Sequence, residues 1–175
     1  MKDILIRRLI EVGALKFGEF ILSSGQKSNV YVDIKHACTF PDILNLIVKL
    51  MSQKLRNVEF DKIACIELGG VPIAVALSIE INKPYVIFRK VKKDYGMKDD
   101  CIGVVRENER FIVVEDVTTT GSSALSVVER VEKKGGKVVK ILSVVDRGAK
   151  VDKLDSILTL NDLLSALKSM GEEKI

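Results

Sequence analysis

The apolar residues of the chain occur in short continuous runs that alternate with longer segments of helical spacing. The runs have the length and β-branched character of buried strands, and they cover residues 62–67, 84–88, 111–114 and 138–145. The helical segments cover a stretch opened by Pro41, residues 73–81, residues 123–134 and a last stretch that starts at Asn161 as expected N-cap and ends near Met170. This alternation predicts an α/β fold with a central, mostly parallel sheet flanked by helices.

The N-terminal part of the chain breaks this alternation. Residues 4–12 have the spacing of a short helix that Gly13 can end. Two segments of alternating polarity follow around a polar loop and predict a hairpin, with strands at 17–22 and 30–34. We expect this helix and hairpin to form a small hood. The prediction is one domain over residues 1–175, with the hood elements at 1–36 and a core at 37–175.

Composition limits the class of protein. The chain has 175 residues, of which 47% are apolar and 30% are charged, and its net charge of +4 comes without a Lys/Arg block typical of nucleic-acid tails. It has no run of about 18 apolar residues, so no membrane span is expected. The three cysteines, Cys38, Cys65 and Cys101, form no C-x-x-C pair. A disulfide framework or a zinc site is therefore not expected, and the cytoplasm is the expected compartment.

The segment after the predicted strand at 111–114 has the clearest chemistry. Two carboxylates, Glu115 and Asp116, are followed by Val117 and then by six residues that are all Thr, Gly or Ser. A loop of small residues at a helix N-terminus offers backbone N–H groups and a favourable dipole to a phosphate, whereas the carboxylates suit sugar hydroxyls or a metal held on the same ligand. The segment therefore predicts a site for a phosphorylated sugar. A plain turn with an N-cap is the structural alternative, and Ser122 in the place of a lysine excludes a Walker A loop.

Cations follow two other predicted strands. Residues 89–103 are charged, contain two glycines and lack an apolar face, so they form either a solvated loop or a lid over an anionic ligand. Arg147 comes after Asp146 at the end of a strand, where α/β sheets bind ligands and where a guanidinium suits a carboxylate. A surface arginine is the alternative there. Gly69-Gly70 is interpreted as a close approach to a ligand or as an ordinary helix-entry turn.

These segments resemble those of a known family. Residues 111–123 resemble the phosphoribosyl diphosphate motif of type I phosphoribosyltransferases, which several kinds of enzyme share. Residues 17–28, followed by Tyr31-Val32-Asp33, resemble the N-terminal signature of orotate phosphoribosyltransferases. Residues 89–96 resemble that family's mobile catalytic loop, and Asp146-Arg147 resembles its orotate-binding position. The segments occur in the family's order and cover most of the chain.

The resemblance implies a reaction and a set of site residues. The reaction transfers the phosphoribosyl group of 5-phosphoribosyl 1-diphosphate (PRPP) to orotate, giving orotidine 5-phosphate and diphosphate in pyrimidine biosynthesis. The implied catalytic residues are Lys93, Glu115 and Asp116, and Thr119 and Arg147 are implied to bind orotate. The residues implied to bind PRPP are Arg89, Lys90, Lys93, Tyr95, Glu115, Asp116, Val117, Thr118, Thr119, Thr120, Gly121, Ser122 and Ser123.

The resemblance also implies a cofactor and a partner. Mg²⁺ is expected to be held mainly by substrate oxygens, without a metal site made by the protein. A homodimer is expected in which the loop at 89–103 acts across the interface. Neither nucleic acid nor membrane is an expected partner.

The chain departs from the family pattern at three positions. Ser23 and Gly69 stand where bacterial members usually have lysine, and Tyr95 replaces the histidine of many members. Two other functions stay open. A related transferase could act on a purine, against which Arg147 and residues 17–28 argue. A non-catalytic relative could bind nucleic acid, against which the lid cations and the small net charge argue.

Overall fold

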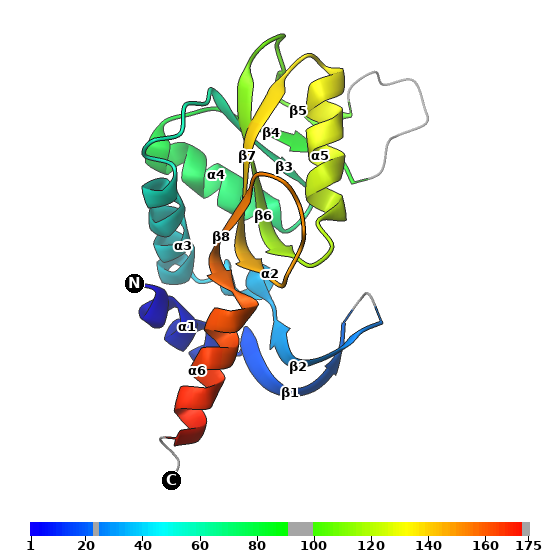
Figure 1. The fold of residues 1–175 in the computed structure, drawn as a ribbon. Coiled ribbons are helices and arrows are strands. Elements are labelled where there is room, and N and C mark those ends of the chain that lie inside the picture. Colours follow the sequence, from blue (N-terminus) through cyan, green and yellow to red (C-terminus); the bar gives the residue numbers. More distant parts are fainter. Residues whose placement is uncertain (23–24, 91–99, 173–175) are drawn as a thin grey trace.

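A six-stranded sheet forms the centre of the computed structural model, which describes residues 1–22, 25–90 and 100–172 (Figure 1). The strand order is β5-β4-β3-β6-β7-β8, and every neighbouring pair is parallel except β4 and β5. The strands are β3 (Lys62–Ile66), β4 (Tyr85–Phe88), β5 (Cys101–Ile102), β6 (Arg110–Thr118), β7 (Lys137–Asp146) and β8 (Leu154–Thr159). The predicted α/β class with a mostly parallel sheet is confirmed.

Helices cover both faces of this sheet. One face carries α3 (Pro41–Lys54) and α4 (Gly70–Ile81), and the other carries α5 (Ser122–Lys133). Successive residues of a strand point to opposite faces, so in β6 Ile112 and Val114 join the core of the first face whereas Phe111 and Val113 join the core of the second. This double burial explains why the central strands have continuous apolar runs.

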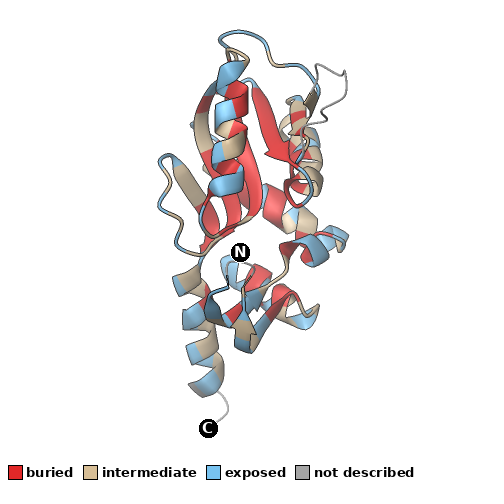
Figure 2. Cartoon of the chain, turned by 90° about the vertical axis from the view of Figure 1, so that its right-hand side faces the viewer, coloured by how far each residue is buried: buried red, intermediate tan, exposed pale blue. Residues whose placement is uncertain are grey.

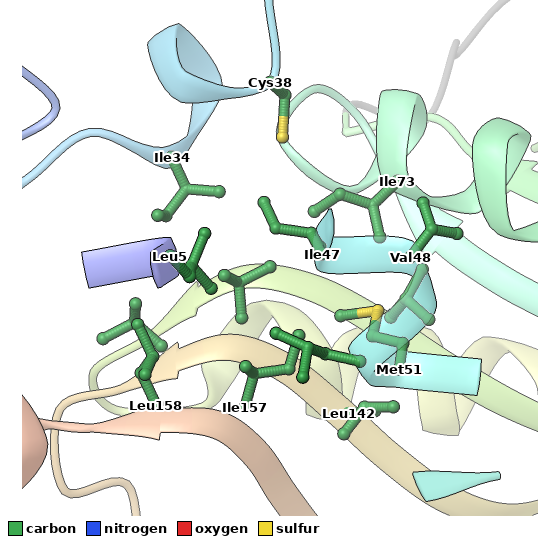
Figure 3. Packing of buried hydrophobic residues seen from close by; sticks show 14 of the residues in the cluster. Leu5, Ile34, Cys38, Ile47, Val48, Met51, Ile73, Leu142, Ile157 and Leu158 are labelled. Carbon is green, nitrogen blue, oxygen red and sulfur yellow. The ribbon is translucent and has the colours of Figure 1, made fainter. Parts of the chain in front are cut away.

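The core of the first face is built from helices and strands that are far apart in the sequence. Figure 3 shows Ile47, Met51 and Ile73 from α3 and α4 close to Leu142 and Ile157 from β7 and β8. In Figure 2 the strands are mainly buried, whereas the helices carry exposed residues on their outer sides. The sheet is thus a buried scaffold for the loops at its ends.

The predicted helix and hairpin of the hood are present, and two helices that were not expected there lie beside them. The N-terminal elements are α1 (Lys2–Glu11), the antiparallel hairpin of β1 (Leu15–Ile21) and β2 (Lys27–Val32), and the short helix α2 (Ile34–Ala37). The last helix, α6 (Leu160–Glu172), lies at the same end of the molecule, and its Leu167 and Met170 line a groove with Phe17 and Phe20 of β1 (Figure 1). The two ends of the chain therefore meet around the hairpin.

The structure corrects several predicted boundaries. The strand β8 was not predicted, because Asp155 and Ser156 interrupt its apolar residues. The final helix is not capped by Asn161. Instead, Thr159 and Asp162 exchange side-chain to backbone hydrogen bonds of 2.8 and 3.2 Å in a capping box. The predicted strand at 111–114 continues to Thr118, so the carboxylate pair lies inside β6 and not after it.

None of the described helices is both long enough and apolar enough to span a membrane.

Candidate active site

A pocket of about 770 Å³ opens at the carboxyl ends of β3 and β6. Its walls come from the hairpin, α2, the segment after β3, the acid pair of β6, the N-terminus of α5 and Arg147. Ligands of open α/β sheets bind at this edge. The pocket is therefore the candidate active site.

The acid pair is buried in this pocket. Glu115 is 5% exposed and Asp116 is 8% exposed. Burial, together with the neighbouring charge of Asp116, raises the pKa of Glu115 to about 8, against the opposing effect of the Lys35 charge. Oε1 of Glu115 has no hydrogen-bond partner among the described residues. One buried oxygen of this carboxyl group therefore has an unused capacity for hydrogen bonding.

Asp116 already has a partner in Lys35, a residue that the sequence interpretation missed. The Lys35 ammonium donates a 2.9 Å hydrogen bond to Oδ2 of Asp116, and this bond raises the pKa of Lys35. Asp33 brings Lys35 to the site, because its carboxylate caps α2 by accepting from the backbone N–H of His36 at 3.0 Å and so starts a helical turn there. An aspartate three positions before His36 is the sequence signal for this cap.

Gly69 faces Asp116 from the other side. A Cβ atom at position 69 would lie 2.2 Å from Oδ2 of Asp116. At Gly70 a Cβ would lie 2.9 Å from the carbonyl oxygen of Val114 and 3.0 Å from Cβ of Cys65. The two glycines therefore let the start of α4 pack closely on β3 and β6 and leave room for the Asp116 carboxylate, a role that the sequence interpretation did not include.

The loop of small residues lies where the phosphate site is predicted. Gly121 has φ of 83°, a left-handed conformation that favours glycine, and α5 begins at Ser122. Thr119 and Ser123 line the pocket. Thr118 is buried, and its hydroxyl bonds with Ser143 at 3.1 Å and with Asp146 at 2.9 Å. Thr118 therefore supports the loop, and its hydroxyl is not directed to a ligand.

Arg147 joins the end of β7 to the hairpin. Its Nη2 donates to Oγ of Ser28 at 2.7 Å and to the carbonyl oxygen of Val30 at 2.9 Å. Burial lowers the pKa of the guanidinium from its usual value. Both bonds use Nη2, so Nε and Nη1 are left without a protein partner among the described residues. Arg147, at the predicted orotate-binding position, thus contacts Ser28 and Val30 in the hairpin that carries the N-terminal signature.

The first residues of the charged loop are held at the pocket edge. Lys90 lines the pocket, and its backbone N–H donates to Glu67 at 3.1 Å. The buried guanidinium of Arg130 donates to the carbonyl oxygen of Arg89 at 2.7 Å and to the Asp100 carboxylate at 2.9 Å. Arg130 therefore fixes both described ends of this loop.

The structure brings together about half of the residues that the sequence predicts for the site. The residues that line the pocket are Lys90, Glu115, Asp116, Val117, Thr119, Ser123 and Arg147. Those that lie beside it are Arg89, Thr118, Thr120, Gly121 and Ser122. Lys93 and Tyr95 lie outside the described residues, as does Ser23. The lining also contains residues that the sequence did not single out, among them Asp33, Lys35 and Glu67.

Within the described part of the chain, no three His, Cys, Asp or Glu side chains are grouped as a metal site would require. The pocket lining does contain the neighbouring carboxyl groups of Glu115 and Asp116. Its carboxylates fit a metal that arrives with most of its ligands, such as Mg²⁺ on a diphosphate.

Comparisons with known proteins agree on one family. The phosphoribosyl transferase domain family matches residues 39–161. The orotate phosphoribosyltransferase of Archaeoglobus fulgidus is 59% identical over 170 residues, which cover 97% of this chain and 96% of that protein. The crystal structure of orotate phosphoribosyltransferase from Aeropyrum pernix superimposes with a TM-score of 0.84 at 28% identity and covers 94% of this chain and 98% of that one.

A further solved structure shows what a related pocket holds. The orotate phosphoribosyltransferase of Mycobacterium tuberculosis in complex with 5-phospho-alpha-D-ribosyl 1-diphosphate has a TM-score of 0.74 and 28% identity, covering 93% of this chain and 98% of that one. The match extends over nearly the whole of each protein, and the relatives share one name. The chain therefore belongs to the orotate phosphoribosyltransferase family.

Proposed function

We propose that the protein transfers the phosphoribosyl group of PRPP to orotate, giving orotidine 5-phosphate and diphosphate in pyrimidine biosynthesis. One observation carries the proposal: a buried acid pair, a helix N-terminus and a guanidinium meet in one pocket. These groups match the sugar hydroxyls, the phosphate and the carboxylated base of the two substrates. The family membership and the substrates named for its relatives support the same reaction.

The 5-phosphate is assigned to the loop at 118–123. Backbone N–H groups at the start of α5 and the hydroxyls of Thr119 and Ser123 are the donors. Thr120 and Ser122 stabilise the turn, because the Thr120 hydroxyl accepts from the backbone N–H of Ser122 at 3.3 Å. Thr118 supports the loop through its buried hydroxyl, which bonds with Ser143 and Asp146. The loop is thus arranged before the ligand arrives, which lowers the entropic cost of binding.

The ribose ring is assigned to Glu115 and Asp116. Its 2- and 3-hydroxyls would donate to these carboxyls, which line the pocket. The transition state for loss of diphosphate has positive charge on the ring, and a carboxylate within the buried pocket stabilises that charge. The role of the protein is to orient the reactants and stabilise charge, and no nucleophilic side chain is required.

The departing diphosphate is assigned to the cations of the loop at 89–103. Arg89 and Lys90 stand at the described start of this loop. Lys93 and Tyr95 are proposed to act beside them on the strength of the family resemblance. The loop is further proposed to act across the interface of a homodimer and to exclude water from the reactive carbon.

Mg²⁺ is proposed as the cofactor, held mainly by diphosphate oxygens, and the Glu115 and Asp116 carboxyls are protein groups of the pocket that would be suited to contact it. When bound, it offsets negative charge on the diphosphate.

Orotate is assigned to Arg147, whose free N–H groups suit its carboxylate, and to Thr119. Residues 1–175 are proposed to work as one domain. The cytoplasm is the proposed compartment because Cys38, Cys65 and Cys101 form no disulfide within the described part of the chain.

The proposal is tested by following orotate consumption with PRPP and Mg²⁺ for the wild type and for Asp116→Asn. We expect the wild type to turn over and the variant to lose on the order of 10²-fold in turnover, a typical loss for one electrostatic group in an active site. Stability should change little, because the Lys35 partner of Asp116 is 57% exposed. Equal turnover by the two proteins would remove Asp116 from the reaction.

A further inference from the structure

Among the described residues, Lys35 is the cation that forms an ion pair with the acid pair of the pocket. Its Nζ atom is 2.9 Å from Oδ2 of Asp116, and the charges of Asp33 and Glu115 also favour its protonated form. Its side chain remains 57% exposed, whereas that of Asp116 is 11% exposed. The pair thus joins a fixed, buried carboxylate to a long side chain that is free to turn in solvent.

The other described cations of the pocket make their protein contacts away from Asp116. Among the described lining residues the cations are Lys35, Lys90 and Arg147. Arg147 is bonded to the hairpin through Nη2, and Lys90 is tied through its backbone to Glu67. Gly69, on the wall across from Lys35, leaves no room for a side chain, since its Cβ would lie 2.2 Å from Asp116. Of these described cations, the one that contacts Asp116 therefore comes from α2.

Binding of the sugar changes what Lys35 can do. The ribose hydroxyls are assigned to Asp116, and there they compete with the ammonium for the same oxygens. A lysine has three donors on a flexible stem, so it can leave one acceptor for another nearby. The highly charged diphosphate of PRPP leaves from the carbon next to the 2-hydroxyl, and it is the strongest acceptor that arrives with the sugar.

We propose that Lys35 is a substrate-binding residue that holds Asp116 in the free protein and passes to the diphosphate group of PRPP when the ribose takes its place. The proposal rests on the proposed function, because it uses the assignment of the ribose to Asp116. It adds a residue to the site and explains why a buried acid pair is tolerated in the free protein. The ion pair between Lys35 and Asp116 is then a temporary contact that the ligand replaces, and not a fixed structural bridge.

The test measures binding by calorimetry, without orotate, for three ligands in the presence of Mg²⁺: PRPP, diphosphate and ribose 5-phosphate. For Lys35→Gln we expect PRPP and diphosphate to bind on the order of tenfold more weakly, as for loss of a charge-assisted hydrogen bond. Ribose 5-phosphate should bind as well as to the wild type or more tightly, since its hydroxyls no longer compete with the ammonium. Lys35→Arg should restore most of the diphosphate affinity.

Two controls separate this role from a structural one. Lys49→Gln removes the same charge from an exposed position of α3 and should leave all three affinities unchanged. Asp116→Asn frees Lys35, so diphosphate should bind at least as tightly as to the wild type, and this reading does not depend on the folding of the Lys35 variants. The proposal is overturned if Lys35→Gln binds diphosphate within twofold of the wild type, if it loses all three ligands equally, or if Asp116→Asn weakens diphosphate binding. Wild-type turnover of another base in place of orotate would refute the proposed function but leave these binding results decisive for Lys35.

Discussion

Glu115 should make the free protein less stable as the pH rises from about 4.5 to about 8. Its ordinary pKa is 4.5, and burial raises the pKa in the folded protein to about 8. Below pH 4.5 the carboxyl is protonated in both states and costs nothing. Between the two values the unfolded chain releases the proton while the folded protein keeps it, so the unfolded state gains free energy as the pH increases.

The size of this effect follows from the gap between the two pKa values. At about 1.4 kcal/mol for each pH unit, the full gap corresponds to at most about 5 kcal/mol. The opposing charge of Lys35 is already contained in this gap. Rearrangement of the pocket reduces the effect, so we expect a loss of about 2–4 kcal/mol over this range. That is a large part of the stability of an ordinary domain.

The assay is urea unfolding of the wild type and of Glu115→Gln at several pH values between about 5 and 8. The amide has the same size as the carboxyl but does not titrate, so the difference between the two proteins isolates Glu115 from every other group. The wild type should lose stability relative to the variant as the pH rises. Parallel curves, or a relative gain by the wild type, would refute the argument from burial.

Three other substitutions test the geometry of the site. Gly69→Ala places a Cβ 2.2 Å from the Asp116 carboxylate, so kcat/KM for PRPP should fall by about tenfold or more, and an unchanged value would show that the carboxylate can move without loss. Arg130→Met removes the buried contact with Asp100, so it should lower the free energy of unfolding by about 2–3 kcal/mol in urea titrations. The loss is expected to be no larger because Lys134 still pairs with Asp100 at 3.1 Å. A change within about 0.5 kcal/mol, as is usual for surface substitutions, would contradict this prediction. Arg147→Ala should raise the KM for orotate by an amount that corresponds to about 2–3 kcal/mol, and an unchanged KM would remove Arg147 from the base site.

The core of the fold could be predicted because its periodicity is a direct result of burial. The strands β3, β4, β6 and β7 lie between layers of helices and therefore have continuous apolar runs. The edge strand β8 escaped prediction because Asp155 and Ser156 interrupt its pattern. Asp155 finds its partners in Lys54 and Lys140, at 3.2 and 3.4 Å, from α3 and β7. Both partners are distant from Asp155 in the sequence, so the local pattern of apolar and polar residues does not indicate them.

The site was predictable where its residues are contiguous and not where they meet across the fold. Glu115 and Asp116 could be assigned because they precede a loop of small residues at a strand end. Lys35 could not, since its contact joins residues 81 positions apart and depends on the turn that Asp33 starts. Gly69 was linked to a ligand, but the space that it leaves is occupied by Asp116. Long-range contacts of this kind require the structure.

The central claim is that this pocket joins PRPP to a carboxylated pyrimidine. The most direct measurement is the rate of PRPP-dependent base consumption by the wild type with orotate, adenine and hypoxanthine in separate reactions with Mg²⁺. The account predicts turnover of orotate alone, because only orotate has a carboxylate for Arg147. Turnover of adenine or hypoxanthine with none of orotate would contradict it.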